Sequence, residues 1–275
     1  MLVFHSHCQM ANQMFMYAAA LNLSKGKQTK YCLSNLSNLK YFNLTRHEHL
    51  RNNLKYFWFR ISNFFKKYQF EHFQDNFKDY TSLLLSCPSN CWLYGYFQGE
   101  QYFSDSKDEV RKRFEIKEKY KIDYANWSNN YSHNKRMVAV HVRRKDYKDF
   151  KMEELGGPDL CLPSSFYWKL LQRFINNNEY LIVFLSDEIC EVEQEFNTIP
   201  NAIFLKKSAI VDLQILMKAD ILILANSSFS WWGAWLNQNP NKIIYVPKYF
   251  LGFKVKKEYP VNIIPENWIQ IDVYE

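Results

Sequence analysis

The chain has 275 residues, of which 47% are hydrophobic and 18% aromatic, so it can bury a sizeable core and intrinsic disorder is excluded. Its longest apolar stretch, residues 14–21, is too short to span a bilayer, and the N-terminus lacks the basic-then-apolar layout of a secretory signal, so we expect a cytoplasmic protein. The net charge of +7 favours anionic partners, which include nucleotides, phosphoglycans, lipid headgroups and nucleic acid.

The first half of the chain carries a weak structural signal. Residues 1–4 read as the start of a short strand, and residues 12–23 have helical spacing. Residues 40–80 are crowded with aromatic residues and lysine but show no clear period. The fold of this half is therefore less well defined by the sequence than that of the second half.

A polar, asparagine-rich stretch at residues 117–136 predicts a domain boundary that separates residues 1–134 from residues 135–275. The second half alternates apolar strands with helical segments. Strands are expected at 137–142, 181–185, 202–205, 221–225 and 243–246, and helices at 163–175, 210–219 and 229–236. This alternation predicts an α/β fold with a parallel sheet covered by helices on both faces.

Polar residues follow three of the predicted strands. They are His141 to Arg144, Ser186 with Asp187, and Asn226 to Ser228. Because ligands of open parallel sheets bind at the carboxyl ends of the strands, we expect these segments to lie along one rim. Two adjacent guanidiniums at a strand end suit a fixed anion such as a diphosphate, whereas the plainer alternative is a strand followed by solvated charges.

The segment after the strand at 221–225 reads Asn-Ser-Ser-Phe-Ser-Trp-Trp-Gly-Ala-Trp, which places hydroxyl groups and free amides at a helix start. That arrangement suits an anion, although simple capping of the helix by Ser227 or Ser228 uses the same geometry. We expect Gly233 to allow close packing of the helix on the sheet, and the tryptophans to be core residues. No Asp-x-Asp, phosphate loop or Gly-x-Gly-x-x-Gly occurs, so a bound diphosphate would be held without a metal ion.

Four segments together resemble the bacterial α-1,2-fucosyltransferases of glycosyltransferase family 11. His141-Val-Arg-Arg-Lys-Asp-Tyr147 is similar to the family's His-x-Arg-Arg-x-Asp-Tyr, and residues 225–236 are similar to its C-terminal signature. Gly95-Tyr-Phe-Gln98 resembles its central segment, and Asn12-Gln-Met-Phe-Met-Tyr-Ala18 resembles its N-terminal one. The matches keep the family's order and cover nearly the whole chain.

The resemblance implies an inverting transferase that moves L-fucose from GDP-β-L-fucose to the 2-hydroxyl of a galactose. It implies two Rossmann-like domains of the GT-B type with a cleft between them. The N-terminal domain would carry the acceptor side and the C-terminal domain would bind GDP-fucose, with the last residues free to pack back on the first domain. GDP-fucose would be the donor substrate, with no cofactor. The acceptor would be a galactose-terminated oligosaccharide or glycolipid of surface polysaccharide or lipopolysaccharide synthesis. Such an acceptor is compatible with peripheral contact of the protein with the inner face of the membrane.

The resemblance also implies site residues. Arg143 is similar to the arginine that holds the donor diphosphate. The other implied donor-binding residues are Arg144, His141, Asp187, Asn226, Ser227, Ser228, Asn12 and Gln13. Asp187 could equally cap the helix that follows it, and Asn12 or Gln13 could cap the helix expected at residues 12–23.

A one-step inversion needs a base for the acceptor hydroxyl proton. Asp146 is the first candidate because its motif position matches, and Asp149, Glu153 and Glu154 compete with it. Asp146 could instead be an ion-pair partner that orients one of the two arginines.

The N-terminal loop departs from the family pattern. Where the family has Gly-Gly-Leu-Gly, this chain has Cys8-Gln-Met-Ala11. Glycines there would permit a positive φ and a close backbone approach to a ligand. Because of this departure, two alternatives stay open. One is a degenerate protein that binds the nucleotide sugar without turnover, and the other is a transferase for another GDP-sugar or acceptor.

The basic and aromatic residues between Lys55 and Tyr68 support a rival interpretation, a nucleic-acid-binding protein. The same segment could lie on a membrane surface. We favour a core role for its aromatics, then a membrane surface, and expect no nucleic-acid partner.

Overall fold

The computed structural model describes residues 1–6, 8–44, 46–64, 71–73, 86–88, 91–131 and 135–274. The chain divides into two compact units, Met1–Lys117 and Glu118–Glu275. This division falls before the predicted boundary at residue 134, because the polar stretch forms helix α5 (Ile122–Tyr131) of the second unit. The Gln214 amide donates a hydrogen bond of 2.9 Å to the Tyr120 carbonyl, which ties the start of this segment to helix α9 of that unit.

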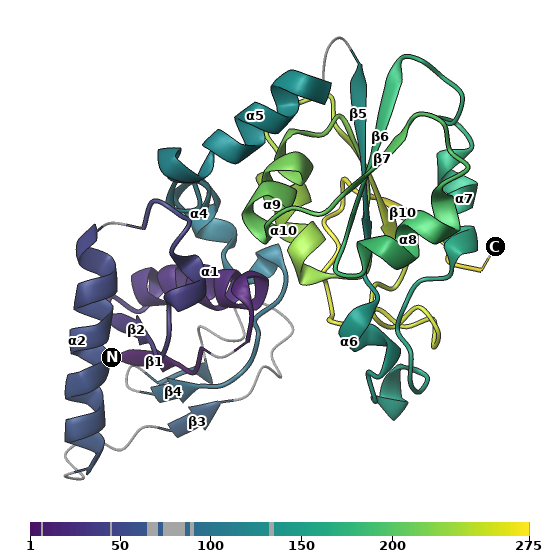
Figure 1. The fold of residues 1–275 in the computed structure, drawn as a ribbon. Coiled ribbons are helices and arrows are strands. Elements are labelled where there is room, and N and C mark those ends of the chain that lie inside the picture. The colour runs from purple at the N-terminus through teal and green to yellow at the C-terminus, as the bar shows by residue number, and fades with distance from the viewer. Residues whose placement is uncertain are drawn as a thin grey trace. The chain divides into compact units, whose positions relative to one another are not determined.

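The first unit contains a parallel sheet with the strand order β2-β1-β4-β3 (Figure 1). Its strands are β1 (Leu2–Phe4), β2 (Tyr31–Leu33), β3 (Glu71–Phe73) and β4 (Cys91–Leu93). Its helices are α1 (Met10–Gly26), α2 (Arg46–Phe64) and α4 (Lys107–Arg113), with short 3-10 helices at Ser37–Leu39, Glu100–Tyr102 and Ser104–Ser106. The predicted first strand and first helix are thus confirmed, the helix being longer than expected.

Helix α2 accounts for the aromatic stretch that showed no period. Its Phe59 is 2% exposed and packs in the core, whereas Phe57 and Trp58 are 57% and 63% exposed. Because apolar residues occupy two faces of the helix, the 3.6-residue period is blurred in the sequence. The expected core role is therefore right for Phe59 and wrong for the other two. The remainder of the Lys55–Tyr68 segment beyond Phe64 lies outside the described residues.

The second unit is a six-stranded, fully parallel sheet with the order β10-β9-β8-β5-β6-β7. Its strands are β5 (Arg136–Val142), β6 (Tyr180–Ser186), β7 (Ala202–Leu205), β8 (Ile221–Ile223), β9 (Ile243–Pro247) and β10 (Ile269–Ile271). Besides α5, its helices are α6 (Lys145–Lys148), α7 (Ser164–Leu171), α8 (Ile189–Phe196), α9 (Ala209–Lys218) and α10 (Ser228–Leu236), with 3-10 turns at Glu118–Tyr120 and Glu153–Leu155. The predicted α/β alternation is confirmed, although α7 ends four residues earlier than expected.

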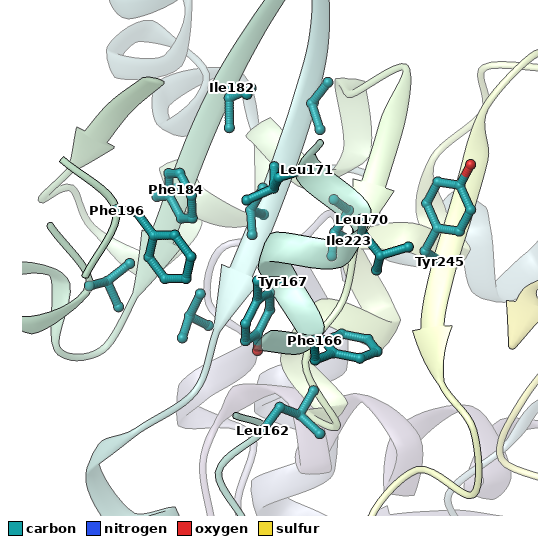
Figure 2. Close-up of a cluster of buried hydrophobic side chains, with 14 of the residues drawn as sticks. Leu162, Phe166, Tyr167, Leu170, Leu171, Ile182, Phe184, Phe196, Ile223 and Tyr245 are labelled. Atoms are coloured by element: carbon teal, nitrogen blue, oxygen red, sulfur yellow. The ribbon is translucent and has the colours of Figure 1, made fainter. Parts of the chain in front are cut away.

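Helices cover both faces of this sheet. Figure 2 shows the apolar cluster between α7, α8 and the strands, in which Phe166, Tyr167 and Phe184 are fully buried. Helices α9 and α10 cover the opposite face (Figure 1). Trp231, Trp232 and Trp235 of α10 are buried, as expected for core residues.

Gly233 has a different packing role from the predicted one. A Cβ atom built at this position would collide with the Leu216 side chain of α9. The glycine therefore permits close approach of two helices, not of a helix and the sheet.

All six cysteines are free thiols. In the described part of the chain, no helix has both the length and the hydropathy that a membrane span requires.

Candidate functional site

Three strand ends of the second unit meet at one edge of its sheet, as predicted. Arg143 follows β5 and its Nη1 lies 3.2 Å from Oδ2 of Asp187, which follows β6. The Tyr147 hydroxyl donates a hydrogen bond of 2.9 Å to the Asn226 carbonyl, which follows β8. The His141 ring lies 5.5 Å from the Phe229 ring of α10. The polar rim expected from the sequence is therefore present.

Arg143 is the cation at the centre of this rim. Its side chain is 19% exposed, and it forms ion pairs with Asp146 at 2.7 Å and with Asp187 at 3.2 Å. Burial lowers the pKa of Arg143, but Asp146 and Asp187 outweigh that effect, so the net pKa is raised and the charge is secure. Its Nε–H is buried and has no hydrogen-bond partner among the described residues. One donor of this guanidinium is therefore not used by any residue that the structure describes.

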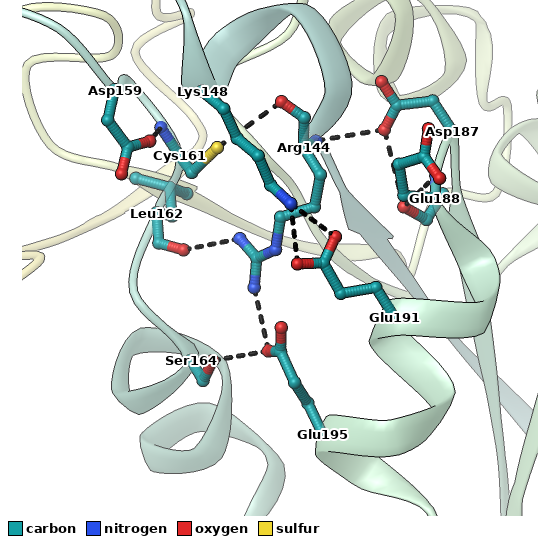
Figure 3. Close-up of polar contacts among 11 residues, drawn as sticks. Arg144, Lys148, Asp159, Cys161, Leu162, Ser164, Asp187, Glu188, Glu191 and Glu195 are labelled. Carbon is teal, nitrogen blue, oxygen red and sulfur yellow. Dashed lines mark hydrogen bonds and ion pairs between the residues drawn. The ribbon is translucent and has the colours of Figure 1, made fainter.

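Arg144 is not positioned beside Arg143 as the sequence suggested. Figure 3 shows its guanidinium directed toward α7 and α8, where it donates to the Leu162 carbonyl at 2.8 Å and pairs with Glu195 at 2.9 Å. The reason is the two-residue period of a strand, because Val138, Val140 and Val142 face that side and Arg144 continues their direction. The expectation of two guanidiniums facing one anion is not met. The contribution of Arg144 to the rim is its backbone N–H, which donates to Asp187 Oδ1 at 3.0 Å.

Tyr147 and His141 of the same motif lie near Arg143. The Tyr147 ring lies beneath the guanidinium, with 5.5 Å between the guanidinium carbon and the ring centre. His141 is 4% exposed, and burial, assisted by the Arg143 charge, lowers its pKa to about 3. It is therefore neutral at pH 7, and its Nδ1 has no hydrogen-bond partner in the described ranges. The positioning role of Tyr147 was not predicted from the sequence, although the motif itself contains the residue.

Asp187 does not cap a helix. Helix α8 begins after Glu188 without a side-chain cap, and the Glu188 N–H donates to Ser186 Oγ at 3.0 Å. Asp187 instead joins Arg143 to the Arg144 backbone. The capping alternative for Asp187 is thus wrong.

The residues at the start of α10 have different roles. The Asn226 side chain is fully buried and donates to the Leu160 carbonyl at 2.9 Å, so it fixes the neighbouring loop. Ser227 caps the helix, because its Oγ accepts from the Phe229 N–H at 3.3 Å. Ser228 is half-buried, and its hydroxyl has no hydrogen-bond partner among the described side chains and backbone. Of the three predicted donor-binding residues, Ser228 thus has the least committed side chain.

The candidate bases differ in their surroundings. Asp146 is 56% exposed and bound to Arg143, which matches the alternative of an orienting ion-pair partner. Asp149, Glu153 and Glu154 are exposed. Within the described ranges, Asp146 alone of these four contacts the rim, and its assignment as base stays a prediction.

The first unit brings together two of the resembling segments. Asn12 Oδ1 accepts a hydrogen bond of 2.9 Å from the Gln98 amide. Gln13 is fully buried and donates to the Cys8 carbonyl at 3.2 Å, while its Oε1 has no partner within the described residues. Neither side chain caps α1, whose N-cap residue Gln9 makes no side-chain cap bond. Their donor-binding role stays a prediction.

Cys8 has a φ of 73°, in the left-handed region that glycine adopts most readily. The loop therefore has the backbone conformation that a glycine would favour, although a cysteine occupies the position. A cysteine in this conformation carries steric strain that a glycine would not.

Within the described ranges, no group of three or more His, Cys, Asp or Glu side chains could hold a metal ion. Metal-independent chemistry stays a prediction.

The structure is similar to that of the NodZ α-1,6-fucosyltransferase soaked with GDP-fucose. The TM-score is 0.56, and the match covers 86% of this chain and 92% of that chain. The sequences are 10% identical over this match, so the likeness shows the fold alone. The predicted fold class, two α/β units of the GT-B type, is confirmed.

Two curated proteins of Escherichia coli are similar in sequence. The O-antigen biosynthesis glycosyltransferase WbnK is 28% identical over 224 residues, which cover 76% of this chain and 68% of that protein. An α-1,2-colitosyltransferase is 31% identical over 192 residues, which cover 65% of this chain and 61% of that protein. The chain thus matches about two thirds of the length of these relatives.

The sequence model of one family matches residues 3–272, which is nearly the whole chain. All four resembling segments lie within this range, as do the rim residues around Arg143. On this evidence the chain belongs to glycosyl transferase family 11.

Proposed function

We propose that this chain is an inverting fucosyltransferase that moves L-fucose from GDP-β-L-fucose to the 2-hydroxyl of a galactose. The acceptor would be a galactose-terminated glycan of surface polysaccharide or lipopolysaccharide synthesis, modified in the cytoplasm. Membership of glycosyl transferase family 11 supports glycosyl transfer. Similarity to an O-antigen biosynthesis glycosyltransferase supports a polysaccharide acceptor.

The observation that carries the proposal is the position of Arg143. Its guanidinium lies at the carboxyl edge of a parallel sheet, over the ring of Tyr147, whose hydroxyl bonds the Asn226 carbonyl just before α10. Its buried Nε–H has no hydrogen-bond partner among the residues that the structure describes. A diphosphate oxygen is a suitable acceptor for this donor, and charge-assisted hydrogen bonds to phosphate are among the strongest in proteins. The half-buried Ser228 hydroxyl and the first-turn amides of α10 would add further donors.

In the proposed reaction, the acceptor 2-hydroxyl oxygen attacks C1 of fucose on the face opposite the diphosphate. The new C–O bond forms as the bond from C1 to the phosphate oxygen breaks, and GDP leaves with the electron pair of that bond. Arg143 stabilises the negative charge that develops on the departing diphosphate. The hydroxyl proton passes to a carboxylate, for which Asp146 is our first candidate.

The test is a panel of galactose-ended acceptors with GDP-fucose, run with and without EDTA, with the product linkage read by NMR. We expect a fucose on the galactose 2-hydroxyl and no effect of EDTA. A linkage to another hydroxyl would contradict the proposed regiochemistry. Calorimetric binding of GDP without fucose transfer to any acceptor would instead support the degenerate nucleotide-sugar-binding alternative.

A second candidate donor follows from the similarity to the α-1,2-colitosyltransferase. The same acceptor panel should therefore be run with nucleotide-activated colitose. If kcat/KM with this donor exceeds that with GDP-fucose, the chain is a colitosyltransferase, and the role of Arg143 is unchanged because both donors carry the diphosphate.

A further inference from the structure

Helix α2 exposes a row of large apolar side chains. Leu54, Phe57 and Trp58 are 49%, 57% and 63% exposed, and their i, i+3, i+4 spacing places them on one face of the helix. The Phe57 and Trp58 rings contact each other edge to face, with 6.1 Å between their centres. We call these three residues the α2 stripe. Contiguous exposed apolar side chains rimmed by polar residues are typical of surfaces that contact a protein or a membrane.

The opposite face of α2 attaches the helix to its own unit. The Asn52 side chain donates to the Leu33 carbonyl and accepts from the Leu33 N–H, both at 2.7 Å. Phe59 packs against Trp92, with 5.3 Å between ring centres. At 3.6 residues per turn, these anchors lie on the side of the helix opposite the stripe. The α2 stripe is therefore directed away from the sheet of the first unit, beside which α2 runs in Figure 1.

Basic residues flank the stripe. Residues 51–62 contain Arg51, Lys55 and Arg60 and no acidic residue. Arg51 and Lys55 lie along one edge of the stripe on the helix surface, and Arg60 lies along the other edge. The stripe is thus an apolar band between two cationic borders.

One cationic border opens into a cavity of about 300 Å³. Arg51, Lys55 and Arg113 line it, together with Tyr17 and Tyr31. Lys55 Nζ donates to the Tyr31 carbonyl at 3.1 Å, and Arg113 pairs with Glu109 at 3.1 Å. Arg51 is exposed and has no ion-pair or hydrogen-bond partner among the described residues. The cavity therefore carries positive charge that suits an anionic group such as a phosphate.

From these features we propose that α2 binds the surface of an anionic lipid bilayer. The α2 stripe enters the interface between headgroups and acyl chains, and the cavity beside it receives a lipid phosphate. Trp and Phe with flanking basic residues form the composition that binds such interfaces. A soluble anion alone would account for the cavity but not for the stripe. A symmetric contact between two copies would cover the stripe but would bring the cationic borders of both copies together, which is unfavourable.

The test is flotation of the full chain with vesicles of phosphatidylcholine alone and of phosphatidylcholine containing about 30% phosphatidylglycerol, an anionic lipid. We expect clear binding to the anionic vesicles and weak binding to the neutral ones. Replacing the exposed aromatics in a Phe57→Ser/Trp58→Ser variant should lower binding about tenfold or more, since these rings supply the inserted apolar surface. An Arg51→Gln/Arg60→Gln variant should lower binding to anionic vesicles by about fivefold for each charge removed, and 1 M salt should have the same effect.

Two exposed residues of the second unit provide matched controls. Ile122 is 58% exposed, so Ile122→Ser removes a comparable apolar side chain, and Lys206→Gln removes an exposed charge. Both variants should bind vesicles like the wild type. Because vesicle binding is measured without turnover, the result is independent of the proposed transferase activity.

Three results would overturn the proposal. The first is equal vesicle binding by the wild type and by the Phe57→Ser/Trp58→Ser variant. The second is a dimer in light scattering that this variant dissociates, with no vesicle binding by the wild type, because the stripe would then be a contact between copies. The third is displacement of the chain from vesicles by inorganic phosphate or RNA when a chloride solution of the same ionic strength does not displace it. The basic border would then serve a soluble anion.

Discussion

Replacing each of the two adjacent arginines separately should give two different phenotypes. Arg143 faces the polar rim, and its Nε–H has no partner in the described part of the chain, whereas the Arg144 guanidinium lies between α7 and α8. We expect Arg143→Ala to lose most of its transfer activity while the chain stays folded. We expect Arg144→Ala to destabilise the second unit first, with any loss of activity following from that.

The magnitudes follow from burial. The Arg144 side chain is 6% exposed, and its removal breaks a buried ion pair, which costs about 3–5 kcal/mol in proteins. Glu195 is 26% exposed and retains the Ser164 hydroxyl as donor, so the lower end applies, about 3 kcal/mol. That corresponds to a fall in Tm of roughly 6–12 °C. Removal of Arg143 costs only about 1 kcal/mol, because Asp146 is largely solvated and Asp187 keeps the Arg144 N–H.

The assay pairs thermal unfolding with transfer from GDP-fucose for both variants. Arg143→Ala should lose about 10²- to 10³-fold in kcat with a nearly unchanged Tm, since it removes a charge that stabilises the leaving group. Arg173→Ala, at an exposed arginine, is the control and should match the wild type in both measurements. Near-normal turnover by Arg143→Ala would refute the assignment of the rim. A wild-type Tm for Arg144→Ala would refute the structural role of the second arginine.

Three further changes test the surroundings of the two sites. Cys8→Gly removes the strain of a φ of 73° and should raise the free energy of unfolding by up to about 1 kcal/mol in denaturant titrations; a decrease would show that the loop is not strained. Gly233→Ala places a Cβ against Leu216 and should destabilise the protein by about 1–3 kcal/mol, whereas a neutral result would mean that α9 and α10 can separate without cost. Burial lowers the pKa of His141 from 6.5 to about 3, so below pH 6.5 the unfolded chain binds a proton that the folded chain does not. The free energy of unfolding should therefore fall by about 2 kcal/mol between pH 6.5 and 5, and a His141→Gln variant should show a shallower slope over that range. Equal slopes for the two proteins would mean that the histidine is protonated in the folded state.

The sequence was sufficient to predict the sheet of the second unit and its polar rim. Continuous apolar runs such as Leu181 to Leu185 are typical of buried parallel strands, and the carboxyl ends of such strands share one edge. The direction of the Arg144 side chain could also have been predicted, because adjacent residues of a strand point to opposite faces. The partner of Arg144, Glu195, was not predicted, because the two arginines were interpreted as a pair and Glu195 is 51 positions away along the chain.

Other features depend on contacts that a single sequence does not specify. Helix α2 carries apolar residues on two faces, so no amphipathic period marks it. The polar helix α5 looked like a linker, and its attachment depends on a hydrogen bond between Gln214 and the Tyr120 carbonyl. The bond between Asn12 and Gln98 likewise joins two motifs separated by 86 positions, and spacing alone could not have predicted it.

The two interpretations of Asp146, ion-pair partner and catalytic base, are compatible if donor binding separates it from Arg143. Asp187 is 16% exposed and also holds the Arg144 N–H, so it is fixed, whereas Asp146 is 56% exposed and its ion pair is worth at most about 1 kcal/mol. A diphosphate that binds Arg143 would therefore displace Asp146 first, which leaves a carboxylate without a cation beside the reaction centre.

Asp146→Asn should therefore bind GDP at least as tightly as the wild type in calorimetry, while its kcat collapses. Asp187→Asn should weaken GDP binding, because Arg143 loses its fixed partner. Weaker GDP binding by Asp146→Asn with an unchanged kcat would mean that Asp146 only orients the arginine.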